Sequence, residues 1–289
     1  MMTISSIMDS QKNETKLRLH IAVVDGFPSI NMIKIYTLRE RIRSDVEFNF
    51  YNAKKVETDL KGVQAKGNSL CSRILLPELL PDDVEKLIML DVGDLLVLRD
   101  LSEMYNWDMK NKTYYGIIDP QFGRYGVISK KPMDIYINVG NYLIDVKKVK
   151  NEKIYEKIVE NKNKYHSHLF EQDLLNDLAY GKIGYLPMRF GIISPFWNDK
   201  SSDNPPYNTA YKDYKLIIKE QYKEMYPFLP KDINEMNVQA YNPVVIHQWN
   251  GKWKDGDGLT IYRRIAQYYI KYAGIWNEMC EKQPGYCQK

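Results

Sequence analysis

The sequence predicts an α/β fold with a central mixed, mostly parallel sheet flanked by helices. Short apolar runs alternate with segments of helical periodicity, and two of the apolar runs end in aspartates. The chain has 289 residues, of which 44% are hydrophobic and 27% charged, so it can bury most of its unfolded surface in one large domain. This composition excludes disordered, collagen-like and coiled-coil proteins.

Charge, cysteine content and the N-terminus restrict the partners and the compartment. The 41 Lys and Arg exceed the 37 Asp and Glu by only four, so we expect no nucleic-acid partner. Cys71, Cys280 and Cys287 are too few and too odd in number for a disulfide framework. The first fifteen residues contain no signal-peptide core, and no window has the apolar length of a membrane span. We therefore expect a cytoplasmic protein.

The first elements predict a βαβ unit. Residues 17–25 form a short apolar run that is typical of a buried strand and ends at Asp25. Helical spacing of apolar residues follows over 29–43, and residues 46–51 alternate as in a strand. Residues 1–16 precede this unit, and we expect them to form a flexible segment.

The next elements continue the alternation. Residues 70–80 predict a helix stopped near Pro77 and Pro81, and residues 86–90 form an apolar strand that ends at Asp91. Because ligands bind beyond the carboxyl ends of strands in open α/β sheets, these acidic strand ends predict a site. Further strands are expected at 114–119, 135–138, 142–146 and 183–187, with helices over 149–159 and 169–178 and a Pro-rich loop, a candidate mobile lid, at 194–211.

Two motifs carry chemistry. Asp91-Val-Gly-Asp94 places two carboxylates after a strand, where they would suit Mg²⁺ or Mn²⁺ beside a phosphate, although solvated carboxylates also cap ordinary strands. A second apolar strand, residues 244–247, ends at His247 and is followed by Gly251, Lys252 and Lys254. Together they supply an acidic pair, an imidazole and positive charge for a diphosphate.

Four blocks in this order resemble glycosyltransferase family 8, the group that includes glycogenin and bacterial lipopolysaccharide galactosyltransferases. The blocks are residues 72–105, 136–149, 170–176 with GKIGYLP after it, and 243–254. The resemblance covers nearly the whole chain. It implies one Rossmann-like domain of the GT-A type over residues 17–280, followed by a tail at 281–289.

This resemblance also implies an activity and a site. The activity is retaining transfer of a hexose, with glucose or galactose favoured, from a UDP-sugar to an acceptor hydroxyl with Mn²⁺ or Mg²⁺. The implied donor-binding residues are Ala22, Val23, Asp25, Arg73, Asp91, Val92, Asp119, Asn138, Gly251 and Lys252. The implied catalytic residues are Glu171 and Gln172, and the implied metal ligands are Asp91, Asp94 and His247.

Three departures from the family pattern leave alternatives open. The acidic motif has one residue more than Asp-x-Asp, so Asp94 reaches the metal only if Gly93 accommodates a longer turn. Glu171 stands where the family usually has Asp, and Lys252 and Lys254 compete for the diphosphate. The alternatives are a non-catalytic protein that binds nucleotide sugars and a UDP-sugar hydrolase.

The acceptor does not follow from the sequence, and a glycan, a lipid-linked group or a protein all remain open. Residues 260–279 form a basic, aromatic amphipathic pattern that favours packing on the sheet over weak contact with a membrane surface. A homodimer also stays open.

Overall fold

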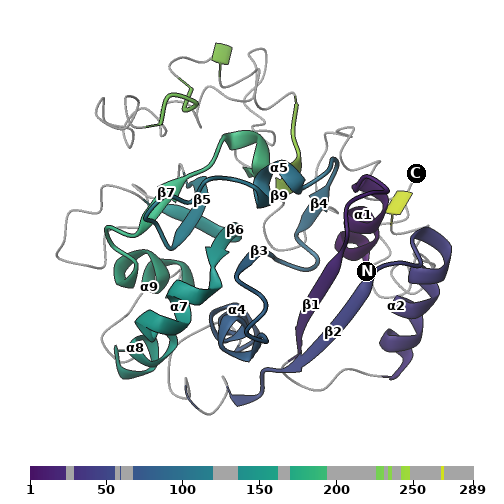
Figure 1. The fold of residues 1–289 in the computed structure, drawn as a ribbon, viewed down its shortest axis with the longest axis horizontal. Helices are drawn as coiled ribbons and strands as arrows, with labels where there is room; N and C mark the ends of the chain where they lie inside the picture. Colours follow the sequence, from purple (N-terminus) through teal and green to yellow (C-terminus); the bar gives the residue numbers. More distant parts are fainter. Residues whose placement is uncertain are drawn as a thin grey trace, which may run out of the picture.

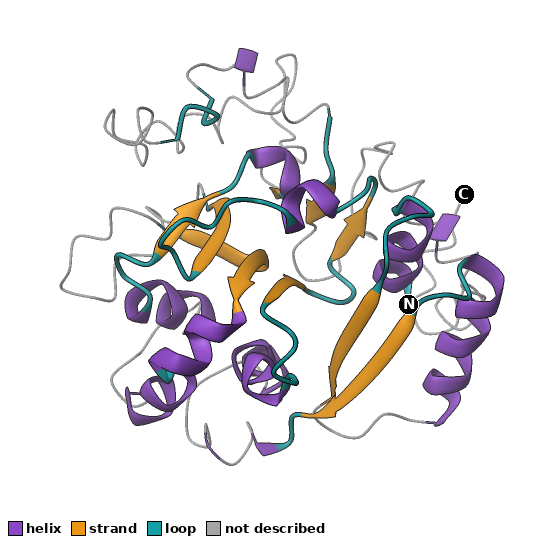
Figure 2. Cartoon of the chain, in the orientation of Figure 1, coloured by secondary structure: helices purple, strands orange, loops and turns teal. Residues whose placement is uncertain are grey.

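The computed structural model describes residues 1–23, 29–55, 59, 68–119, 136–161, 170–193, 226–230, 234–235, 242–247 and 268–269. In this part of the chain the strands lie toward the middle and the helices surround them (Figures 1 and 2). The α/β class is therefore confirmed. The expected loop at 194–211, most of the expected helix at 260–279 and the tail at 281–289 lie outside the described residues.

The first unit confirms the predicted βαβ arrangement. Its elements are α1 (Met2–Ser10), β1 (Arg18–Val23), α2 (Ser29–Ile42) and β2 (Glu47–Asn52). Strands β1 and β2 pair in parallel along their whole length, which is the arrangement that a helical crossover produces.

The N-terminal segment differs from the expectation of flexibility, because most of it is the helix α1. Residues 2–8 of this helix are buried. Ile4, Ile7 and Met8 recur at helical spacing and pack into the hydrophobic clusters of the domain. The segment therefore forms a helix of about two turns that is buried over most of its length.

The remaining strands form two sheets, one of four strands and one of three. The four-stranded sheet has the order β3-β6-β5-β7, and the three-stranded sheet has the order β4-β9-β8. Their bounds are β3 (Lys86–Leu90), β4 (Leu95–Val97), β5 (Tyr114–Ile118), β6 (Ile137–Asp145), β7 (Ile183–Tyr185), β8 (Ile192–Ile193) and β9 (Val245–His247). Among the described strand pairs, three are parallel and three antiparallel, so the sheets are mixed but not mostly parallel.

The helices cover these sheets. They are α4 (Asn68–Leu79), α5 (Ser102–Tyr105), α7 (Val146–Glu152), α8 (Ile154–Asn161), α9 (Phe170–Leu178) and the short 3₁₀ helix η2 (Met188–Phe190). Figure 1 shows α7, α8 and α9 together at one side of the four-stranded sheet, with α4 between them and β1. No helix within the described ranges has the length and apolarity needed to cross a bilayer.

Two predicted segments differ most from the structure. The strands expected at 135–138 and 142–146 are one strand, β6, because Gly140 and Asn141 continue the pairing with the β3 edge. The helix expected at 149–159 is divided into α7 and α8 at Lys153, which has φ +51°. Helix α4 ends at Leu79, one residue before the predicted end, and Pro77 lies within its last turn.

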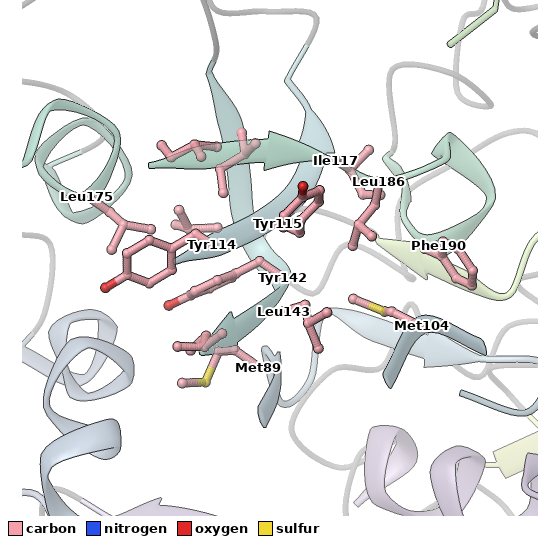
Figure 3. Packing of buried hydrophobic residues seen from close by; sticks show 14 of the residues in the cluster. Met89, Met104, Tyr114, Tyr115, Ile117, Tyr142, Leu143, Leu175, Leu186 and Phe190 are labelled. Carbon is pink, nitrogen blue, oxygen red and sulfur yellow. The ribbon is translucent and has the colours of Figure 1, made fainter. Parts of the chain in front are cut away.

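The core lies between the four-stranded sheet and the helices, and it fixes the strands that carry the site. Tyr114 on β5 and Tyr142 on β6 lie side by side with ring centroids 6.1 Å apart, above Met89 of β3 (Figure 3). All three side chains are buried. At the opposite end of this pair of strands, Ile118 and Ile137 lie side by side and are fully buried, so the neighbouring polar residues Asp119 and Asn138 occupy defined positions.

Candidate functional site

A cavity of about 640 Å³ lies between β1 and β3, which belong to different sheets. It includes the carboxyl ends of both strands, where the sequence predicts a site. Six of the predicted residues line it: Ala22, Val23, Arg73, Asp91, Val92 and Asp94. The fold therefore brings together the end of β1, one face of α4 and the acidic turn after β3.

Arg73 and Asp91 form an ion pair at this cavity. The Arg73 side chain is buried, and its Nη2 lies 2.9 Å from Oδ1 of Asp91. Its Nη1 donates to the carbonyl of Val139 over 2.6 Å. The backbone N–H of Asp91 donates to the carbonyl of Gly140 over 2.9 Å. Strand β6 thus anchors both members of the pair.

The charges around this pair are unbalanced. Burial raises the pKa of Asp91 to about 7 against the opposing effect of Arg73, and the carboxylates of Asp94 and Glu171 raise it further. Burial lowers the pKa of Arg73, but Asp91 and Glu171 raise it more, so the guanidinium stays charged. Asp91 and Glu171 act on the one guanidinium, and Asp94 adds a further negative group beside Asp91, so the arrangement favours binding of a cation.

The acidic turn, residues 91–94, leads from β3 into β4. Gly93 has φ +102°, a backbone conformation that side chains rarely adopt, so glycine suits the longer spacing between the two aspartates. Val92 at the tip is 62% exposed. The end of β9 pairs with the start of β4, which places the His247 backbone opposite Leu95, the residue after Asp94.

The carboxylates of Asp91 and Asp94 are suitable ligands for a divalent cation, since Mg²⁺ and Mn²⁺ prefer oxygen donors. In the described part of the chain, no group of three His, Cys, Asp or Glu side chains is arranged to hold a metal ion. The side chain of His247 lies outside that part. The two aspartates fit such an ion when further ligands join them.

A second group of predicted residues forms a buried network beside β6. Asp119, which follows β5, is 1% exposed, and its Oδ2 accepts hydrogen bonds from Asn138 Nδ2 (3.2 Å) and Gln172 Nε2 (3.0 Å). Asn138 Oδ1 accepts from the N–H of Gly140 (2.8 Å), and Gln172 Oε1 accepts from the N–H of Val139 (3.1 Å). The network therefore shares a strand segment with the Arg73–Asp91 pair.

Tyr136, Asp173 and Asn176 extend this network, although the sequence interpretation assigned them no role. The Tyr136 hydroxyl donates to Asp173 and accepts from Gln172 Nε2 over 3.1 Å. Asn176 bonds both backbone groups of Ile137, with its Oδ1 accepting over 2.8 Å and its Nδ2 donating over 2.9 Å. One signal was present in the sequence, because residues 172 and 176 are polar and lie on one face of a helix.

Glu171 lies at the start of α9 and is partly buried. Its charge raises the pKa of both members of the Arg73–Asp91 pair, so the carboxylate lies within electrostatic range of this pair. Glu171 is therefore a third negative group beside the Arg73–Asp91 pair.

Four predicted positions are not placed by the structure. Asp25, Gly251, Lys252 and Lys254 lie outside the described residues. Their assignments to the uridine and the diphosphate remain predictions.

Solved structures of glycosyltransferases share this fold. The galactosyltransferase LgtC, solved in complex with donor and acceptor sugar analogues, matches with a TM-score of 0.61 at 20% identity, over 94% of this chain and 91% of that chain. The bifunctional glycosyltransferase WbbM matches with a TM-score of 0.72 at 14% identity, over 98% of this chain and 49% of that chain. The fold is the GT-A fold.

The sequence identifies the family. The profile described as glycosyl transferase family 8 matches residues 1–255, and the chain belongs to this family. A putative glycosyltransferase of Haemophilus influenzae is 32% identical over 116 residues, 38% of this chain and 35% of that protein. General stress protein A of Bacillus subtilis is 29% identical over 213 residues, 71% of this chain and 65% of that protein. The matches thus span about a third of the first relative and less than two thirds of the second.

Proposed function

We propose that this chain transfers a hexose from a UDP-sugar to an acceptor hydroxyl, with retention of anomeric configuration and with help from Mn²⁺ or Mg²⁺. The observation that carries the proposal is the cavity at the end of β1, in which the buried Arg73 guanidinium meets the acidic turn. Membership of family 8 supports glycosyl transfer. Glucose and galactose are the favoured hexoses because of the family resemblance.

The leaving group of this reaction is a nucleoside diphosphate, which gains negative charge as the anomeric C–O bond breaks. Asp91, Asp94 and His247 would hold a divalent ion, which when bound would neutralise that charge. Arg73 keeps Asp91 oriented through the ion pair. Gly251 and Lys252 would contact the phosphates, and Ala22, Val23 and Asp25 the uridine.

The sugar ring gains positive charge in the same step, and the second group of residues would face it. Glu171 would stabilise this charge, because its carboxylate acts electrostatically on the Arg73–Asp91 pair. Gln172 donates to both Asp119 and Tyr136 and accepts from Val139, so its amide has a fixed orientation. We assign Asp119 and Asn138 to the hydroxyls of the sugar, with Gln172 beside the reacting carbon.

Thermal unfolding with nucleotides tests this function without knowledge of the acceptor. We expect UDP to raise the melting temperature only with Mn²⁺ or Mg²⁺ present, because the acidic turn repels a diphosphate until a cation lies between them. At about 100 times its dissociation constant, a ligand contributes about 2.7 kcal/mol. At roughly 2 to 4 °C per kcal/mol, this corresponds to a shift of about 5 to 10 °C.

Two controls sharpen this test. GDP and ADP should give smaller shifts in melting temperature than UDP. In Asp91→Asn, Mn²⁺ or Mg²⁺ should no longer increase the shift that UDP produces. A non-catalytic binding protein would show the same shifts but release no UDP from a UDP-sugar with any acceptor, whereas a hydrolase would release UDP without one. A melting temperature that responds to no nucleotide, with or without metal, contradicts the proposed function.

A further inference from the structure

Helix α1 lies along the edge of β4 that β9 does not cover (Figure 1). Its side-chain hydroxyls bond the backbone of this edge as a neighbouring strand would. Thr3 Oγ1 donates to the carbonyl of Leu95 over 2.7 Å and accepts from the N–H of Gly93 over 3.0 Å. Further along the strand, Ser6 Oγ accepts from the N–H of Val97 over 3.1 Å.

The Thr3 contacts fall on both sides of Asp94. Gly93 and Leu95 are the residues before and after this aspartate, and one hydroxyl holds both of their backbones. The Thr3 side chain is 0% exposed, so water does not compete for these bonds. Thr3 also lines the same cavity as Asp91 and Asp94.

We propose that Thr3 is a positioning residue for the acidic turn, and that α1 thereby sets how the carboxylates of Asp91 and Asp94 meet a divalent cation. The Thr3 hydroxyl fixes a turn whose glycine has φ +102° and would otherwise have several conformations. Groups that hold metal ligands in orientation contribute strongly to metal affinity. The inference rests on the proposed function, because it requires the turn to bind a cation together with UDP.

Ser6 provides a matched control. Its hydroxyl also satisfies a backbone N–H of β4, and it also lies on the buried face of α1. Its partner, Val97, is at the far end of the three-residue strand from the turn. Thr3→Val and Ser6→Ala each remove a buried hydroxyl that bonds β4, but only the first frees the acidic turn.

Binding of Mn²⁺ in the presence of UDP, followed by the electron paramagnetic resonance signal of free Mn²⁺, gives a readout that does not depend on activity. We expect Thr3→Val to weaken Mn²⁺ binding about tenfold, Thr3→Ser to restore it, and Ser6→Ala to leave it unchanged. Both Thr3→Val and Ser6→Ala should lower the melting temperature of the metal-free protein. Equal Mn²⁺ affinity of Thr3→Val and Ser6→Ala overturns the inference.

Hydrogen exchange on the wild-type chain provides a second test that needs no variant. Because coupling between two sites is reciprocal, binding of Mn²⁺ and UDP should slow amide exchange in α1 as well as in residues 91–95. Slower exchange in the turn alone overturns the role of α1 and leaves the proposed function standing. A wild-type chain that binds no Mn²⁺ with UDP overturns both.

Discussion

Replacing Tyr136 with phenylalanine tests whether the buried network fixes the Gln172 amide. The substitution removes only the hydroxyl, which donates to Asp173 and accepts from Gln172 Nε2. Burial, and after it the Asp173 carboxylate, raises the pKa of Tyr136, so the hydroxyl stays protonated at ordinary pH. Tyr136, Gln172 and Asp173 are all buried, so water does not replace the lost bonds.

The expected cost follows from these two bonds. A hydrogen bond to a charged group contributes about 1.5 to 3 kcal/mol, and a buried N–H left without its acceptor costs about 1 to 3 kcal/mol. We therefore expect Tyr136→Phe to lower the free energy of unfolding by about 3 to 5 kcal/mol. For a chain of this size, that corresponds to a melting temperature lower by roughly 6 to 20 °C.

Urea and thermal unfolding measure this loss, and Tyr155→Phe is its control. The Tyr155 hydroxyl also donates to an aspartate, Asp59, over 2.8 Å, but this bond is only partly buried. The control should therefore cost about 1 kcal/mol. We also expect Tyr136→Phe to lower kcat with little change in the KM for the UDP-sugar, because Gln172 is assigned to the reacting carbon. Equal stability losses for the two variants would refute the reasoning.

The other predictions concern single side chains or glycines. Glu171→Ala should lower kcat by about 10² to 10⁴-fold while UDP-sugar binding persists, and an equal loss of donor affinity would make Glu171 a ground-state ligand instead. Gly93→Ala and Gly181→Ala should each cost about 1 kcal/mol from positive φ alone, since no atom lies within 4 Å of either added Cβ, but only Gly93→Ala should weaken metal-dependent turnover. Burial raises the pKa of Asp100, but hydrogen bonds, that of Ser102 first, lower it to about 2. The ionised Asp100 therefore stabilises the fold above the unfolded pKa, and this contribution is lost as the pH falls toward 2. Asp100→Asn should cost about 1 kcal/mol at pH 7, after allowance for solvent screening, and less at pH 3 by urea unfolding.

Local patterns in the sequence predicted much of the fold. Strand β3 begins and ends as predicted. Its apolar run lies between charged residues, and these mark where the strand begins and ends. The division of β6 into two strands was wrong, because Gly140 and Asn141 resemble a turn in the sequence. Their role depends on pairing with β3, which is remote in the sequence. Local propensity contains no information on such partners.

At the site, too, local patterns could be predicted and contacts between remote residues could not. Asp119, Asn138 and Gln172 were predicted, and the structure brings them into one network. Tyr136 was not predicted as part of this network. One tyrosine among 23 gives no indication of a special role, and its partner Asp173 is 37 residues away. Thr3 was assigned to a flexible segment for the same reason, since its hydrogen bond to Leu95 spans 92 residues.

The short strand β4 has consequences for the order of folding. Its two sides are covered by residues from opposite ends of the chain, α1 on one side and β9 on the other. Pairing of β1 with β2 closes a much shorter loop, because Arg18 and Glu47 are only 29 residues apart. Closing long loops is entropically costly and slows folding. During refolding we therefore expect the βαβ unit to form first, and the acidic turn to reach its final geometry only when β9 pairs with β4.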